Sequence, residues 1–177
     1  MGIINFLPVL ALSFFFATAP SANAQEEDSN LTRSYTYQDW LLSCAAPEGK
    51  EICRLSQVII NKETKKPLAR LMIRRLPNGT DVMIITLQLG VDLRKGAFIQ
   101  ITEDQFINNL TYTMCLADGC RLQFPLNPEI ISAMGNTGEG RLIFGRPNNE
   151  QNIALPVSFA GFTTGYYAYI ASIKSEN

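Results

Sequence analysis

The sequence contains no histidine among its 177 residues. Histidine is the side chain that most often serves as a general base near neutral pH, because its ordinary pKa lies close to that range. Its absence excludes a Ser-His-Asp or Cys-His catalytic site. It also removes the commonest nitrogen ligand of protein-bound zinc.

The sequence also lacks an excess of positive charge and, after its first residues, a long apolar run. Fifteen Lys and Arg residues against sixteen Asp and Glu residues leave a net charge of −1. Binding to phosphates requires a clear cationic excess, so nucleic acid is not expected as the main partner. A membrane span needs about 20 apolar residues. No segment after residue 24 supplies them, so we do not expect an integral membrane protein once the leader described next is removed.

The first 24 residues have the features of a secretory signal peptide. They carry no charged side chain and end in small residues, with Ala22-Asn23-Ala24 fitting an A-x-A cleavage site. The alternative is an uncleaved anchor, but the apolar run is shorter than a membrane span. We expect a location in the periplasm, at the cell surface or outside the cell. The expected divisions are a signal peptide (1–24), a disordered polar arm (25–33), one β domain (34–171) and a tail (172–177).

The four cysteines form an even set, which in an exported chain is typical of disulfides. Three pairings are possible, and the local one joins Cys44 to Cys53 and Cys115 to Cys120. We favour it because each pair brackets a segment rich in turn residues. The spacings do not match a zinc site or a redox-active C-x-x-C motif. The sequence therefore predicts two structural disulfides, with no metal and no cofactor.

Short runs of alternating apolar and polar residues recur along the chain. In residues 68–75, for example, Ala69, Leu71 and Ile73 share one face, and Arg70 and Arg74 share the other. The expected strands begin near residue 35 and include 37–44, 53–60, 68–75, 81–90, 96–101, 111–115, 121–124, 141–145 and 153–159. Many short strands separated by turns predict a mainly β, single-domain antiparallel β-sandwich or partly open barrel.

Two helices are expected beside these strands. Asn127 is a suitable N-cap, Pro128 suits the first helical position, and Gly135 is expected to end the helix. Near the C-terminus, apolar residues at helical spacing favour a short amphipathic helix that caps the core, although Gly165 weakens it. These residues are Phe162, Tyr166, Tyr169 and Ile170.

Basic residues concentrate on one expected hairpin. They are Lys62, Lys65, Lys66, Arg70, Arg74 and Arg75. A stripe of such side chains facing solvent suits sulfated glycans or anionic lipids. The alternative is an ordinary solvated strand surface whose charges discourage edge-to-edge pairing, and the sequence alone favours this alternative.

Five segments of the chain together carry a family likeness. They are YQDWLLSC (37–44), CRLSQVIINKETKKPLARLMIRR (53–75), GVDLRKGAFIQI (90–101), CLADGCRLQFPL (115–126) and GRPNNEQNIALPVSFAGF (145–162). They resemble the invasion-associated locus B family of exported proteins, found chiefly in alphaproteobacteria. The resemblance implies an envelope or secreted location, a binding role and no enzymatic activity. Gly165-Tyr166-Tyr167 departs from the more regular helix that the resemblance leads us to expect.

These observations give two main hypotheses of function. The first is an exported, non-enzymatic, virulence-associated protein that contributes to host-cell adhesion or invasion by contacting a host surface protein or an anionic glycan. The second is a periplasmic structural or chaperone-like envelope factor with only an indirect effect on invasion. A hydrolase without histidine is a third and weaker hypothesis, because Asp92 and Glu103-Asp104 lie in expected loops with nothing to hold a catalytic pair together.

Overall fold

The chain forms two antiparallel β-sheets and two α-helices, in a computed structural model that describes residues 31–148 and 150–174. The strands are β1 (Leu31–Tyr37), β2 (Trp40–Ala45), β3 (Ile52–Ile60), β4 (Pro67–Arg75), β5 (Asp81–Leu87), β6 (Ala97–Gln100), β7 (Phe106–Leu110), β8 (Tyr112–Leu116), β9 (Gly119–Pro125), β10 (Glu139–Phe144) and β11 (Ile153–Ser158). The helices are α1 (Pro128–Gly135) and α2 (Phe162–Lys174), and a 3-10 turn spans Pro47–Gly49. The predicted β-sandwich with a C-terminal helix is confirmed.

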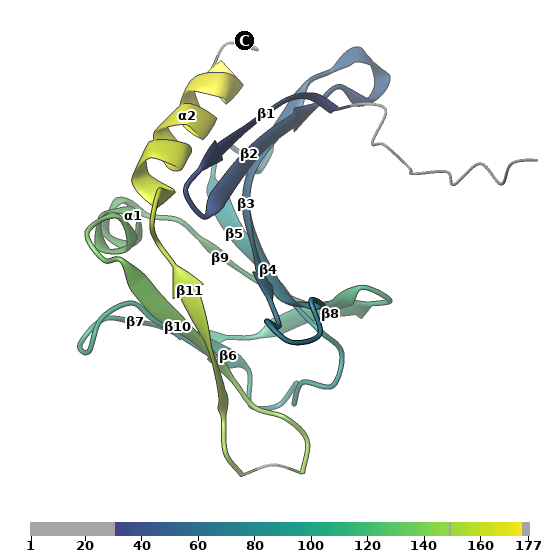
Figure 1. Cartoon of the computed structure of the whole chain (residues 1–177), viewed down its shortest axis with the longest axis vertical. Coiled ribbons are helices and arrows are strands. Elements are labelled where there is room, and N and C mark those ends of the chain that lie inside the picture. Colours follow the sequence, from purple (N-terminus) through teal and green to yellow (C-terminus); the bar gives the residue numbers. More distant parts are fainter. Residues whose placement is uncertain (1–30, 149, 175–177) are drawn as a thin grey trace, which may run out of the picture.

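The larger sheet has seven strands in the order β1-β2-β3-β4-β5-β9-β8, and the smaller has four in the order β11-β10-β6-β7. Figure 1 shows α2 and α1 on the same side of the larger sheet, with the smaller sheet below them on that side. One face of the larger sheet is therefore covered by other elements. We call this the inner face and the opposite one the outer face.

The core lies between the inner face, the smaller sheet and α2. Alternate residues of the central strands point into it, and Leu55, Leu71 and Ile85 are fully buried. Trp40 is also fully buried; its indole Nε1 donates a hydrogen bond to the Ser158 carbonyl at 3.1 Å and its ring meets Phe162 edge-on. The alternation read from the sequence thus selects the buried face of each strand.

Helix α2 is regular and docks against β1, β2 and β3. Gly165, which weakened the expectation of a helix, lies against Leu55 of β3. A Cβ atom at this position would lie 3.0 Å from Leu55 Cδ1. The missing side chain therefore allows close packing, and the predicted helical cap is confirmed. Helix α1 is also confirmed, with the Asn127 side chain accepting a hydrogen bond from the Ile130 amide at 2.8 Å.

Two predicted boundaries differ from the structure. Strand β1 begins at Leu31, so residues 31–33 belong to this strand rather than to the expected polar arm, and Leu31 and Arg33 pair with β2. Helix α2 extends to Lys174, so residues 172–174 belong to it rather than to a tail. The predicted signal peptide, the rest of the arm and residues 175–177 lie outside the described residues.

Two further differences concern strands. Strand β7 was not expected, because Asn108 and Asn109 give it a loop-like composition; it forms by pairing with β6, where Ile107 lies opposite Ile99. Strand β5 ends at Leu87, so Leu89 does not continue its buried face and is 58% exposed. In both cases the neighbouring strand, rather than the local sequence pattern, decides which residues are paired.

Candidate functional site

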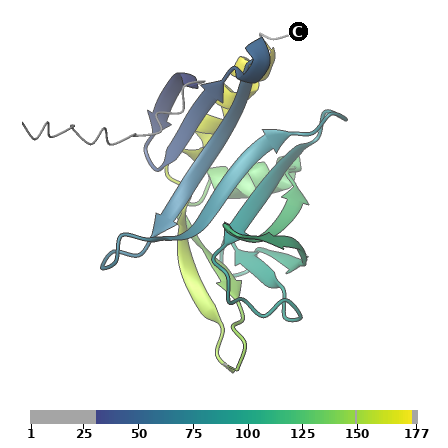
Figure 2. The same ribbon diagram turned by 90° about the vertical axis from the view of Figure 1, so that its right-hand side faces the viewer.

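The outer face of the larger sheet is hollowed into a groove of about 500 Å³. Figure 2 looks onto this face, with both helices behind the sheet. The floor comes from β3, β4, β5 and β9, and the β8–β9 hairpin forms one wall. The groove therefore crosses strands that are distant in the sequence.

Four arginines from three strands surround the floor of the groove. They are Arg54 on β3, Arg70 and Arg74 on β4, and Arg121 on β9. Met72 and Ile84, both half-buried, lie opposite each other on β4 and β5 in the centre. We call this set of four arginines and two apolar residues the arginine groove.

Strand register groups the four arginines into two pairs. Arg70 lies opposite Thr86, which lies opposite Arg121, so one row crosses β4, β5 and β9. The register of β3 and β4 ends at Leu55 opposite Ile73. Continuing it by one residue puts Arg54 beside Arg74, and both line the groove. Arg74 lies four residue steps beyond Arg70 along the extended strand, a span of roughly 13 Å.

The two pairs differ in how their charge is balanced. Arg121 Nη2 donates to Asp118 Oδ2 at 2.8 Å, and this hydrogen bond lowers the pKa of Asp118, with a smaller attraction from Arg70. Among the described residues, no carboxylate lies within ion-pair distance of Arg54 or Arg74. Like charges on facing positions of neighbouring strands repel each other. The Arg54 and Arg74 end of the groove is therefore a place where an anion would be stabilised.

The structure divides the basic residues singled out in the sequence. Arg70 and Arg74 lie in the groove. Lys62, Lys65 and Lys66 lie on the exposed turn between β3 and β4 and are not among the residues that line it. The basic residues of the expected stripe therefore do not line the groove as a unit. Whether the turn lysines contribute to binding stays a prediction.

Two groove residues, Arg54 and Arg121, were missed in the sequence. Arg54 alternates with Cys53 and Leu55 in a strand that was recognised, and Arg121 follows the turn of the second cysteine pair. The alternation alone placed both on solvent-facing positions. Only the strand order, which inserts β9 beside β5, brings Arg121 near Arg70.

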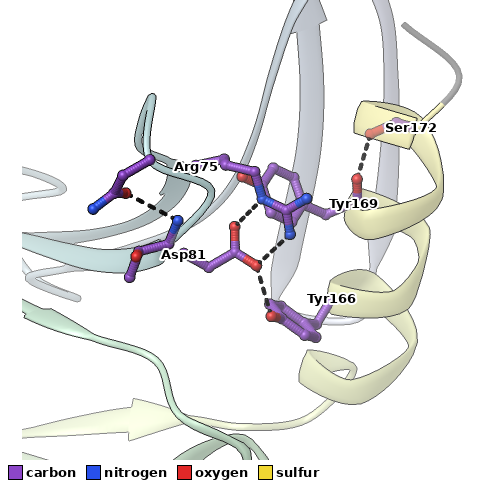
Figure 3. A network of polar contacts seen from close by, with 7 residues as sticks. Arg75, Asp81, Tyr166, Tyr169 and Ser172 are labelled. Carbon is purple, nitrogen blue, oxygen red and sulfur yellow. Dashed lines mark hydrogen bonds and ion pairs between the residues drawn. The ribbon is translucent and has the colours of Figure 1, made fainter. Parts of the chain in front are cut away.

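Arg75, the last residue of β4, belongs to a different site, on the inner side of the larger sheet (Figure 3). Its guanidinium donates two hydrogen bonds to the Asp81 carboxylate, at 2.9 and 2.8 Å, and the Tyr166 hydroxyl donates to the same carboxylate at 2.9 Å. Asp81 is nearly buried. Burial raises the pKa of Tyr166 and of its neighbour Tyr169, and Asp81 reinforces the effect. This network ties the β4–β5 hairpin to α2.

Both disulfides join residues that lie directly opposite each other on neighbouring strands. Cys44 pairs with Cys53 across β2 and β3, and Cys115 pairs with Cys120 across β8 and β9. The local pairing is therefore confirmed. The second disulfide closes the hairpin that carries Asp118 and forms a wall of the groove.

Cys44, Glu51 and Cys53 are the one group in the described part of the chain close enough to be considered as metal ligands. The two sulfur atoms are bonded to each other. A disulfide sulfur is not the thiolate that binds zinc, so this oxidised group does not fit a metal. Neither helix within residues 31–148 and 150–174 has the length and apolar character needed to cross a membrane.

Comparison with known proteins gives two curated relatives. One is the "Invasion protein B homolog" of Brucella abortus (strain 2308), which is 26% identical over 158 residues, covering 89% of this chain and 87% of the relative. The homologue with the same description from Brucella abortus biovar 1 (strain 9-941) gives the same values.

A solved structure shares the fold. The crystal structure of invasion associated protein b from Bartonella henselae matches with a TM-score of 0.71 and 20% identity, over 81% of this chain and 99% of that one. The family model described as "Invasion associated locus B (IalB) protein" matches residues 40–169, which include the whole arginine groove. The chain is therefore a member of the invasion associated locus B family.

Proposed function

We propose that this protein is an exported, non-enzymatic binding protein that contributes to host-cell adhesion or invasion, and that the arginine groove is its contact surface. Membership of the family supports the association with invasion. The two disulfides and the family point to an exported protein. The observation that carries the proposal is the set of four arginines gathered from three strands around one hollow, of which only Arg121 pairs with a carboxylate among the described residues.

The groove suits binding better than a purely structural role. An ordinary strand surface discourages edge-to-edge pairing with charges placed on edge strands. Strands β3 and β4, however, have neighbours on both sides, so Arg54, Arg70 and Arg74 protect no edge. Their mutual repulsion gives the fold no benefit. A negatively charged ligand would pair with these arginines and offset their repulsion.

The test compares two variants in the producing bacterium. The groove variant carries Arg54→Gln, Arg70→Gln and Arg74→Gln. The control variant carries Lys50→Gln, Arg141→Gln and Arg146→Gln, which removes the same charge from exposed positions outside the groove. We expect the groove variant to adhere to and enter host cells as poorly as a deletion strain, and the control variant to behave like the wild type.

The same strains also test the envelope-factor alternative. Protease treatment of intact cells, with a periplasmic protein as marker, is expected to remove the chain from the cell surface, or the chain is expected in the culture medium without lysis. The proposal would be overturned by a groove variant that invades normally. It would also fail if the chain were protected from protease in intact cells, absent from the medium, and its deletion weakened the envelope.

A further inference from the structure

We infer that the arginine groove binds an extended sulfated polysaccharide, held by sulfate groups at two separate places: Arg54 with Arg74 at one end, and Arg70 at the other, where the neighbouring Arg121 also pairs with Asp118. The inference rests on the proposed function and names its ligand class. Its starting point is the geometry of charge on the outer face, where one pair is Arg54 with Arg74 and the other is Arg70 with Arg121.

The spacing of the two pairs requires a long ligand with repeated negative charge. The pairs lie roughly 13 Å apart along β4, while strand neighbours within the first pair lie only about 5 Å apart. A single sulfated sugar can meet one pair and cannot reach the other. A polysaccharide with sulfate groups on successive sugars can meet both.

The chemistry of the groove fits sulfate and sugar together. Guanidinium groups are planar donors that bind oxyanions through two parallel hydrogen bonds. Between the arginine pairs, the floor offers apolar surface from Met72 and Ile84 and the side-chain amide of Gln123. The Thr86 hydroxyl lies within the second pair, between Arg70 and Arg121. A sugar ring presents C–H groups on its faces and hydroxyl groups at its rim, so this mixed floor is complementary to it.

Other anionic ligands fit less well. None of the described residues that line the groove is aromatic, so the groove lacks the stacking surface that proteins use to bind single-stranded nucleic acid. An acidic peptide gains affinity by adding a strand to a free sheet edge. The four strands of the floor all have neighbours on both sides, and the nearest free edge is β8 in the wall of the groove. A peptide added to that edge would pair alongside β8 and would not cross the arginines of β3 and β4. A flat bilayer surface does not follow the hollow.

The direct test titrates the oxidised chain with heparin oligosaccharides of defined length and with the same oligosaccharides after desulfation. We expect binding that weakens with added salt, at least tenfold weaker binding of a disaccharide than of longer chains, and loss of binding on desulfation. Three exposed charge contacts at typical strength correspond to a loss of roughly 10- to 100-fold for Arg54→Gln/Arg70→Gln/Arg74→Gln. The control Lys50→Gln/Arg141→Gln/Arg146→Gln is expected to change affinity less than about threefold, since it changes only the general charge.

Charge-conserving variants separate the effect of the planar guanidinium geometry from the effect of its charge. Arg54→Lys with Arg74→Lys keeps both positive charges but removes the planar fork, so we expect an intermediate loss of affinity. Equal losses in the groove and control triples would reduce the effect to general attraction and overturn the inference. Polyglutamate or single-stranded DNA competing as well as heparin would also overturn it, in favour of a less specific anion surface.

Host cells distinguish this inference from the proposed function. The purified chain is applied to intact cells and to cells stripped enzymatically of sulfated glycans. Binding that is lost on stripping and in the groove variant supports both proposals. If the groove variant loses binding while stripped cells retain it, the groove is a host-contact surface but the ligand class is wrong. If the groove variant binds intact cells as the wild type does, both proposals fail.

Discussion

The two faces of the larger sheet are built by the same strands but differ in burial and in how their charges are paired. On β4, Leu71 and Ile73 face inward and are fully buried, while Arg70 and Arg74 face outward and are exposed. On the inner side Arg75 has a buried carboxylate partner, whereas Arg74, one residue earlier, has none among the described residues. On the inner side of β4 the arginine is paired with a carboxylate, whereas the outer-face arginines of β3 and β4 are left available, and only Arg121 on β9 pairs with Asp118. The predictions below test this contrast.

The largest expected effect is the loss of a buried side chain from the inner face. Leu71→Ala is expected to lower the free energy of unfolding by about 2 to 5 kcal/mol, because it leaves a cavity in the core. Its matched control is Met72→Ala, on the outer face of the same strand and only half-buried. Urea denaturation of the oxidised chain measures both. Equal losses would contradict the assignment of the two faces.

Next comes the buried ion pair. Asp81→Asn is expected to lower the free energy of unfolding by about 2 to 3 kcal/mol, because it removes the charge that pairs with Arg75 and receives the Tyr166 hydrogen bond. The control is Asp118→Asn, which breaks the exposed pair with Arg121 on the outer face and is expected to have a much smaller effect. A larger effect from Asp118→Asn would show that the groove charges are structural.

The two disulfides are expected to differ in what their loss affects. Replacing both cysteines of either pair with alanine is expected to cost about 2 to 3 kcal/mol of stability in the chain-entropy model. Removing Cys115 and Cys120 should in addition weaken heparin binding, since it loosens a wall of the groove, whereas removing Cys44 and Cys53 should not. Thermal unfolding and heparin titration of the two double variants make the comparison. Equal weakening of heparin binding in both would argue that the effect is global.

Alkaline pH is expected to lower the stability of the folded protein, because its buried tyrosines resist deprotonation. The pKa values of Tyr166 and Tyr169 are raised by burial, and burial raises that of Tyr112 to about 12. Above the ordinary tyrosine pKa of about 10, the unfolded chain loses these protons while the folded chain keeps them, so stability falls as pH rises. Each such group contributes a slope of about 1.4 kcal/mol per pH unit. Urea unfolding between pH 8 and 11 measures the slope, and Tyr166→Phe should reduce it; an unchanged slope would contradict the assignment.

The smallest expected change in stability comes from the outer face. Arg54→Gln/Arg70→Gln/Arg74→Gln is expected to alter the free energy of unfolding by no more than about 0.5 kcal/mol, because exposed side chains without ion pairs contribute little. Relief of the repulsion between Arg54 and Arg74 favours a slight gain. Denaturation of this variant therefore serves as the control for its loss of ligand binding. A loss of 2 kcal/mol or more would mean that the arginines support the fold.

Local patterns predicted most of the fold because they reflect local physics. The alternation in β4 and β11, the Asn127 cap and both cysteine pairs depend on residues close in sequence, and all are confirmed. Pro156 lies in β11, the edge of the smaller sheet, where its missing backbone N–H is tolerated. Strand β7 and the start of β1 were missed, because each is defined by its neighbour.

Only two of the four groove arginines were predicted, for the same reason. Arg70 and Arg74 were visible as one side of an alternating strand. Arg54 and Arg121 looked like isolated surface residues, since nothing local indicates which strands become neighbours. The same lack of information grouped Arg75 with the exposed basic residues, although it points to Asp81 on the inner side.

By itself the sequence determined which side of each strand is buried, which cysteines can pair and where the two helices form. Side-chain alternation, turn residues and capping act over a few residues, so they can be read along the chain. Tertiary structure alone decided that β9 lies beside β5, that Arg54 faces Arg74, and that Tyr166 reaches Asp81. These contacts depend on strand order and helix docking, which are set by burying all the apolar faces at once and not by any single segment.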